Sequence, residues 1–261
     1  MESRLLVRDC RELLRGFPDG CADAVITDPP YGIGAYKGDS KKVALLFPEV
    51  LPEIHRVLRP GGALAFFGRW PTFYRWAIAA EEAGFRQREE VIRNLRSPAA
   101  GDLGSLGRIH ETLYIGSSSQ PKEITFNVDD LRVPYHDRYR DGKGFTRLRG
   151  GRKGEKMTRF VPNPLGARPP SIIRSTRVDK PRYHDGQKPL ADCEWLVKLL
   201  ANEGDLVLDP FCGAGTIPLA CANLGRSFIG MDIEQHWVDV SEKRLADAAR
   251  QRNLKLPLEA D

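Results

Sequence analysis

Long hydrophobic runs are missing from this sequence of 261 residues. Its longest apolar stretches, such as residues 63–67, have the length of a buried strand, whereas a transmembrane helix needs about 20 apolar residues. The apolar stretch that follows residues 1–4 is only three residues long, too short for a signal peptide, so we expect no secretory leader. These absences predict a cytoplasmic protein with no membrane association.

Cysteine is scarce and irregularly spaced. The five cysteines are odd in number and no two of them form a C-x-x-C pair. This pattern indicates neither a disulfide framework nor a zinc site. A reduced, intracellular compartment is the simplest interpretation, and we expect no metal site.

Basic residues far outnumber acidic ones over one long segment. Residues 132–188 hold sixteen lysines and arginines against five aspartates and glutamates, while the whole chain has a net charge of +5. The rest of the chain is therefore acidic overall. A basic segment on an acidic body indicates a polyanionic partner at one place, although a solvated surface loop would have a similar composition.

Short apolar strands alternate with helical patterns along most of the chain, which predicts a doubly wound, mostly parallel α/β sheet covered on both faces. Residues 85–96 and 111–115 are expected to form an antiparallel edge pair. The alternation is lost over residues 118–183, which are rich in glycine, proline and basic residues. We therefore expect two halves of one domain, residues 1–117 and 184–261, separated by an insert, 118–183.

A glycine-rich turn follows a predicted strand near the C-terminus. It runs from Asp209 to Thr216 and contains Gly213-x-Gly215, and the next strand ends at Asp232. Glycines let the backbone approach a ligand, and an acidic residue after the next strand can accept hydrogen bonds from a ribose. Pro218 stands where a dinucleotide fingerprint has its third glycine, and no Walker lysine follows. Dinucleotides and nucleoside triphosphates are therefore disfavoured as ligands.

The run Asp28-Pro29-Pro30-Tyr31 comes directly after a predicted buried strand, residues 22–27. An aromatic exocyclic amine is a weak nucleophile because its lone pair is delocalised. Hydrogen bonds from its N–H groups to the Asp28 carboxylate and the Pro29 carbonyl would localise that lone pair, and Tyr31 offers a ring for stacking. A polyproline turn is the alternative, which the preceding strand disfavours.

Together and in this order, the two motifs resemble those of the beta group of DNA amino-methyltransferases. The resemblance implies the seven-stranded methyltransferase fold with circularly permuted motif order, and S-adenosylmethionine as cofactor. It implies that the Asp-Pro-Pro-Tyr run is catalytic. It also assigns a set of residues to cofactor binding: Asp9, Cys10, Asp28, Lys188, Asp209, Phe211, Gly213, Gly215, Thr216 and Asp232.

The first residue of the catalytic run indicates the target base. Relatives acting on adenine N6 typically have aspartate there, whereas those acting on cytosine N4 typically have serine or threonine. Asp28 therefore favours adenine, with the base flipped out of its duplex. Cytosine-N4 methylation, RNA methylation and a non-catalytic nucleic-acid-binding role on the same fold stay open as alternatives.

The basic insert is expected to be the target-recognition region, because lysine and arginine neutralise phosphates. The expected partner is double-stranded DNA. By analogy with such relatives, a homodimer and a separate restriction endonuclease are further expectations.

Overall fold

The computed structural model describes residues 3–34, 39–99, 108–119, 124–135, 145–148, 157–160, 162–174, 178 and 180–255. The chain divides into two compact units, one of Met1–Phe126 with Ser171–Asp261 and one of Asn127–Pro170. The smaller unit is shorter at both ends than the expected insert. Within the described ranges, no helix combines the length and the apolar character that crossing a membrane requires.

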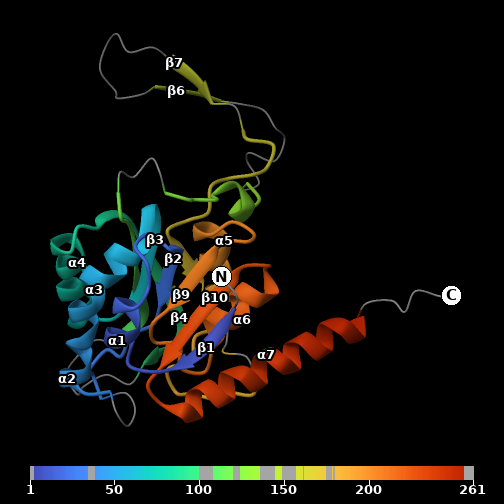
Figure 1. Cartoon of the computed structure of the whole chain (residues 1–261). Coiled ribbons are helices and arrows are strands. Elements are labelled where there is room, and N and C mark those ends of the chain that lie inside the picture. Colours follow the sequence, from blue (N-terminus) through green and yellow to red (C-terminus); the bar gives the residue numbers. More distant parts are fainter. Residues whose placement is uncertain are drawn as a thin grey trace. The chain divides into compact units, whose positions relative to one another are not determined.

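The larger unit contains a sheet, most of whose strands are labelled in Figure 1. It has eight strands in the order β1-β10-β9-β2-β3-β5-β4-β8. β5 runs antiparallel to both of its neighbours, and the other neighbouring pairs are parallel. The bounds are β1 (Arg4–Val7), β2 (Ala22–Thr27), β3 (Leu58–Gly68), β4 (Arg86–Ala99), β5 (Arg108–Ser117), β8 (Ile172–Arg174), β9 (Leu206–Asp209) and β10 (Ser227–Asp232).

The mostly parallel, doubly wound fold class is confirmed, but the expected number of seven strands is wrong by one. The additional strand is β8, which pairs with β4. It comes from the expected insert, where glycine and proline obscured any strand pattern. β4 and β5 are therefore an antiparallel pair, as expected, but β8 rather than either of them is at the edge.

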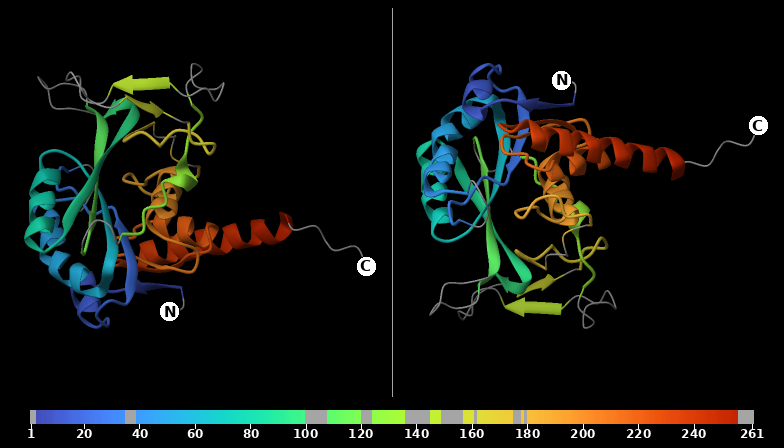
Figure 2. Two further views of the ribbon diagram at one scale, coloured as in Figure 1. Left: turned by 90° about the horizontal axis from the view of Figure 1, so that it is seen from above. Right: turned by 90° about the horizontal axis from the view of Figure 1, so that it is seen from below.

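Helices cover both faces of the sheet. Figure 2 shows α1, α3 and α4 on one face and α5, α6 and α7 on the other. Their bounds, with the short α2, are α1 (Cys10–Arg15), α2 (Lys41–Ala44), α3 (Leu46–Val57), α4 (Thr72–Glu82), α5 (Leu190–Leu200), α6 (Thr216–Asn223) and α7 (Gln235–Lys255). Because both faces are covered, the central β3 is buried along nearly its whole length, as parallel sheets require.

α3 shows how sequence and packing agree. Phe47, Val50, Leu51 and Ile54 follow helical spacing, and all four side chains are buried, so they form the core-facing stripe of an amphipathic helix. The short α2 precedes it as a separate helix, with a break at Leu45.

β9 and β2 are parallel neighbours in the sheet, and successive strands are added in opposite directions on either side of them. The connection from β2 through α3 leads to β3 on one side, and the connection from β9 through α6 leads to β10 on the other. Doubly wound proteins bind ligands at the carboxyl ends of the strands at such a switch point. The two strand ends here are Thr27 and Asp209.

In the smaller unit, β6 (Phe145–Leu148) and β7 (Met157–Phe160) form an antiparallel ribbon. A short 3-10 helix, η1 (Asp129–Leu131), begins the unit. Val133 pairs with Ala167, and the Arg132 guanidinium donates to the Gly166 carbonyl at 2.7 Å. These contacts tie the start of this unit to its end.

Candidate active site

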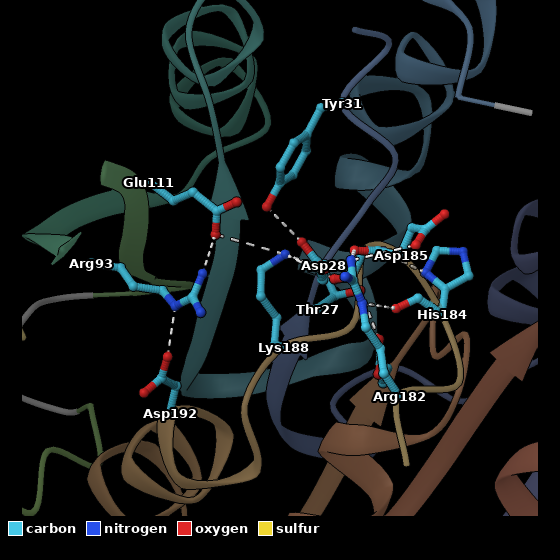
Figure 3. Close-up of polar contacts among 12 residues, drawn as sticks. Thr27, Asp28, Tyr31, Arg93, Glu111, Arg182, His184, Asp185, Lys188 and Asp192 are labelled. Atoms are coloured by element: carbon cyan, nitrogen blue, oxygen red, sulfur yellow. Dashed lines mark hydrogen bonds and ion pairs between the residues drawn. The ribbon is translucent and has the colours of Figure 1, made fainter. Parts of the chain in front are cut away.

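Asp28 is held by two hydrogen bonds directly after β2. Its Oδ1 accepts from the Tyr31 hydroxyl at 2.7 Å, and its Oδ2 accepts from the Lys188 ammonium at 2.6 Å (Figure 3). Burial raises the pKa of Asp28, while the charge of Lys188 acts against this rise. The carboxylate is thus oriented and electrostatically supported where the sequence predicted an acceptor for an amine.

The turn after Asp28 is held by a residue that the sequence did not single out. The Asp39 carboxylate, 4% exposed, accepts hydrogen bonds from the backbone N–H groups of Gly32 and Ile33. Gly32 has a φ of +69°, and a Cβ there would meet the Ala44 side chain at 2.7 Å. The turn therefore has a fixed shape that only glycine fits at this position.

Tyr31 is buried, with 8% of its surface exposed. Its ring packs 6.1 Å from the Trp76 ring, and the Lys188 ammonium lies 5.2 Å from its centroid. Burial, followed by the negative charge of Asp28, raises the pKa of the Tyr31 phenol well above its usual value. The phenol is therefore a permanent hydrogen-bond donor to Asp28, a role that the sequence did not predict. Stacking of a base on this ring stays a prediction.

The glycine loop between β9 and α6 has the backbone geometry that its sequence demands. Gly213 and Gly215 have φ angles of +47° and +72°. A Cβ on Gly215 would lie 2.6 Å from the buried Ser241 hydroxyl, whereas a Cβ on Gly213 would meet nothing within 4 Å. Gly215 is thus required by packing against α7, and Gly213 leaves open space beside the backbone.

Asp232 fixes this loop from the end of β10. Its Oδ2 accepts from the Gly213 N–H at 3.0 Å, and its Oδ1 accepts from the Glu234 N–H at 2.9 Å. Each oxygen retains a lone pair for a further donor. The open backbone at Gly213 beside an acidic acceptor fits a ligand with a hydroxylated sugar.

Two side chains of α7 also support the loop, and no motif in the sequence marked them. The Ser241 hydroxyl donates to the Gly213 carbonyl at 2.8 Å. The buried Arg244 guanidinium donates to the Ala214 carbonyl and, at 3.2 Å, to the Thr216 hydroxyl. Thr216 is the first residue of α6, so the loop and the helix start are braced together.

Asp209 joins the two motifs across the switch point. Its Oδ1 accepts from the Thr27 hydroxyl at 2.8 Å and from the Phe211 N–H at 3.3 Å. Burial raises the pKa of Asp209 to about 8. The residue before Asp28 is therefore hydrogen-bonded to the first residue of the cofactor motif. Phe211 itself packs with its ring 6.1 Å from that of Phe47.

Asp9 and Cys10 begin α1, after β1. The pairing of β1 with β10 and a hydrogen bond from the Arg8 N–H to the Asp232 carbonyl, 2.9 Å, place them near Asp232. The Asp9 carboxylate caps α1 and pairs with Arg11 at 2.6 Å, and burial raises the pKa of Cys10 to about 12. Contact of these two residues with a cofactor stays a prediction.

Lys188 contacts carboxylates of the proposed amine site. The resemblance assigned it to the cofactor, and the structure puts its ammonium on Asp28 and 3.8 Å from Glu111. Glu111 is paired with Arg93 at 2.6 Å, and Arg93 with Asp192 at 2.6 Å. β4 contains many charged residues, so nothing in the sequence marked Arg93, and its partners could not be deduced without the register.

Comparisons with known proteins agree with this geometry. A DNA methylase family specific for N6 and N4 amino groups matches residues 22–243. The type II methyltransferase M.HpaI of Haemophilus parainfluenzae is 30% identical over 256 residues, which cover 94% of this chain and 74% of that protein.

Two solved structures share the fold. The complex of M1.HpyAVI with SAM has a TM-score of 0.63 at 23% identity and covers 93% of this chain and 98% of its own. The cytosine-N4-specific PvuII DNA methyltransferase has a TM-score of 0.68 at 16% identity, with 96% of this chain and 92% of its own covered. The chain belongs to the N6/N4 DNA methyltransferase family and, by the order of its two motifs, to the beta group of that family.

Proposed function

We propose that this DNA methyltransferase transfers a methyl group from S-adenosylmethionine to the N6 amino group of adenine in double-stranded DNA. The observation that carries the proposal is the Asp28 carboxylate, oriented by Tyr31 and Lys188 beside the switch point. The Thr27–Asp209 hydrogen bond joins it to the glycine loop. These contacts support an amine acceptor at Asp28 next to a nucleoside-binding turn at the glycine loop.

The residues of the glycine loop would hold the cofactor. The open backbone at Gly213 would lie against it, and the lone pairs that Asp232 retains would accept from its ribose hydroxyls. Bound S-adenosylmethionine supplies an electrophilic methyl group on a sulfonium.

The chain supplies orientation and electrostatics. Asp28 and the Pro29 carbonyl accept the two N–H groups of the target amine and aim its lone pair at the methyl carbon. As the new N–C bond forms, the bond between the methyl carbon and the sulfonium sulfur would break and leave its electron pair on sulfur. The amine nitrogen becomes positive, and the anionic Asp28 stabilises that charge. The nitrogen then releases one of its protons to solvent, so that the methylated amine is neutral. Fixed positioning of this kind accounts for much of enzymatic rate enhancement.

The test is to incubate the protein with labelled S-adenosylmethionine and duplex DNA of mixed sequence, digest the DNA, and identify the methylated nucleoside. We expect N6-methyldeoxyadenosine. Asp28→Asn should lower the rate by roughly 100-fold or more, because it replaces the anion by a neutral amide. Asp239→Asn, at an exposed position on α7, is the matched control and should retain activity.

Label on cytosine would overturn the choice of base and keep the rest of the mechanism. Label in RNA but not in DNA would overturn the substrate. Failure to bind the cofactor at all would instead support a nucleic-acid-binding protein that lacks the reaction.

The smaller unit is the proposed target-recognition region. Asn127–Pro170 contains eleven lysines and arginines against five acidic residues, a composition that attracts phosphates. Replacing Arg152 and Lys153 by glutamine should weaken DNA binding and reduce the salt dependence of the binding constant, whose logarithmic slope changes by about 0.9 for each phosphate that is no longer neutralised. Lys243 and Arg250 of α7, replaced in the same way, are the control pair. An unchanged slope for the first pair would count against this role.

We also propose a homodimer and a separate restriction endonuclease as partners. The name of M.HpaI, a type II methyltransferase, supports the second of these. Sedimentation of the purified protein tests the first. Protection of methylated DNA from an endonuclease encoded beside this protein tests the second.

A further inference from the structure

A chain of buried charges extends from the proposed amine site into the larger unit. Figure 3 shows Asp28, Lys188, Glu111, Arg93 and Asp192 in this order, with alternating sign. The last four are between 5% and 8% exposed. Methyl transfer at Asp28 does not by itself call for the three members that lie beyond Lys188.

A contribution to folding stability is a weak explanation for this row of buried charges. Burying charges costs solvation free energy, and well-packed apolar side chains in their place are often as stable or more so. The positions of these charges are also fixed by the sheet, because Arg93 and Glu111 are direct cross-strand partners in the β4–β5 pairing. Glu111 lies near the start of the antiparallel β5, opposite the end of β3. It is therefore at the carboxyl ends of the parallel strands, where Asp28 also lies.

Lys188 lies between two carboxylates. Its ammonium is 2.6 Å from Asp28 Oδ2 and 3.8 Å from Glu111 Oε2. It also donates to the Gly186 carbonyl at 3.3 Å. The first contact is a hydrogen bond and the second is an ion pair at longer range, so a small rotation of the lysine side chain would exchange them.

The contact with Asp28 conflicts with the binding of a target amine. Each Asp28 oxygen already uses one lone pair, one for Tyr31 and the other for Lys188, so that an amine has only the remaining lone pairs to bind. An ammonium fixed on Asp28 would compete with the N–H groups of the amine. It would also oppose the positive charge that develops on the amine nitrogen, since like charges repel strongly in a buried site.

Glu111 has the properties of an alternative partner for Lys188. Burial acts to raise its pKa, but the charges of Lys188 and Arg93 outweigh burial, and the pKa of Glu111 is lowered. Asp28, by contrast, has a raised pKa because of burial. Glu111 is therefore the more persistent anion of the two.

We propose that Glu111 is a positioning residue that draws the Lys188 ammonium away from Asp28 when the target amine binds, with Arg93 and Asp192 holding Glu111 in place. This inference rests on the proposed function, in which Asp28 accepts the amine. Before the base arrives, Lys188 keeps Asp28 compensated. Once the base is in place, the ammonium is paired with Glu111 and Asp28 is available to the amine.

A double-mutant cycle tests the proposal. Glu111→Gln removes the alternative anion, so that Lys188 stays on Asp28, and kcat should fall by roughly tenfold or more while cofactor affinity is unchanged. Adding Lys188→Met removes the competing cation, so the double variant should be more active than Glu111→Gln alone. A merely structural role would make the double variant equal to the single one or worse. Glu242→Gln and Lys243→Met, both exposed on α7, are the matched controls.

The cycle must be measured over a range of pH, because loss of the Lys188 ammonium also raises the pKa of Asp28. Titratable groups reach Asp28 from several elements, namely Tyr31 in its own turn, Glu111 in β5, Asp209 in β9, Cys193 in α5, and His184 with Lys188 in the segment before α5. The comparison of double and single variants is made at the pH optimum of each.

If Glu111→Gln does not fold, the position of Lys188 can be tested in the wild-type protein instead. The experiment is a structure of its complex with duplex DNA and a non-reactive cofactor analogue. We expect the Lys188 ammonium within hydrogen-bonding distance of Glu111 and separated from Asp28. An ammonium still bound to Asp28 beside the flipped base would overturn the inference. Wild-type protein that does not methylate DNA would instead overturn the proposed function, so the two failures are distinguishable.

Discussion

The two halves of the site, on either side of the Thr27–Asp209 hydrogen bond, are held together in different ways. In the half at the end of β2, charged side chains hold each other, from Asp28 through Lys188 and onward to Asp192. In the half at the ends of β9 and β10, side chains such as Asp232 hold the glycine loop through hydrogen bonds with its backbone groups.

The difference follows from what each half has to do. A half that acts on a developing charge needs ions whose positions and protonation are controlled. A half that holds a ligand by shape needs a backbone that approaches closely and does not move. Substitutions in the first half should therefore change charge balance and stability, and substitutions in the second should change ligand affinity.

The largest effect is expected from breaking the charged half at its centre. Arg93→Met removes the cation that lies between Glu111 and Asp192 and leaves two buried carboxylates without their shared partner. Breaking a buried ion pair by removing one member typically costs about 3–5 kcal/mol. Chemical denaturation at neutral pH measures this loss in the free energy of unfolding.

Arg250→Met is the control for this prediction. Arg250 forms an ion pair with Asp247 on α7, and its side chain is 78% exposed. Exposed pairs contribute little to stability, so this variant should unfold like the wild type. Equal losses in the two variants would show that the buried chain has no special part in stability, and the contrast between the halves would fail.

Much of the backbone-held half could be predicted from local sequence. Gly213-x-Gly215 after an apolar strand and Asp232 after the next one determine a turn and an acceptor by their order alone, and the structure shows Asp232 bonded to the loop. The buried strand 22–27 and the end of the later strand at Asp232 were also predicted to the residue. Here neighbours in sequence are neighbours in space.

The charged half could be predicted only in part. Asp28 and Tyr31 are close in sequence, but the pairing of Arg93 with Glu111 depends on the register between β4 and β5, which includes irregular shifts. The contact of Lys188 with Asp28 joins residues 160 positions apart. Periodicity gives no information on register or on contacts at this separation, so the network had to come from the structure.

A sharper test of the backbone-held half uses two glycines with similar backbone conformations. Gly215→Ala would put a Cβ 2.6 Å from the Ser241 hydroxyl, which itself supports Gly213. Gly204→Ala has a comparable φ, +85° against +72°, but meets nothing within 4 Å. Both variants should lose about 1–2 kcal/mol of stability from the left-handed backbone.

Only Gly215→Ala should also lose cofactor affinity, by roughly tenfold or more, because the displaced Ser241 releases the loop. Calorimetric titration with S-adenosylmethionine measures the difference. Equal affinity in the two variants would mean that the loop does not depend on its packing against α7.

A third effect concerns Asp209, which lies between the two halves. It is a buried carboxyl, yet among the described residues it has no cationic partner, and its pKa is raised by burial from 3.8 to about 8. Because the folded-state pKa is the higher one, the contribution of this group to stability is complete at acidic pH and is lost as the pH rises toward about 8.

Asp209→Asn retains an oxygen to accept from Thr27 and has no charge to bury. As the pH rises from 3.8 to about 8, the melting temperature of the wild type should therefore fall relative to that of the variant, by about 2–4 °C for each kcal/mol of stability lost in a chain of this size. Asp239→Asn, at its exposed site, should show no such pH-dependent difference. A constant gap between the wild type and Asp209→Asn would mean that Asp209 stays ionised in the folded protein, which would require it to be stabilised by charge, as Asp28 is by Lys188.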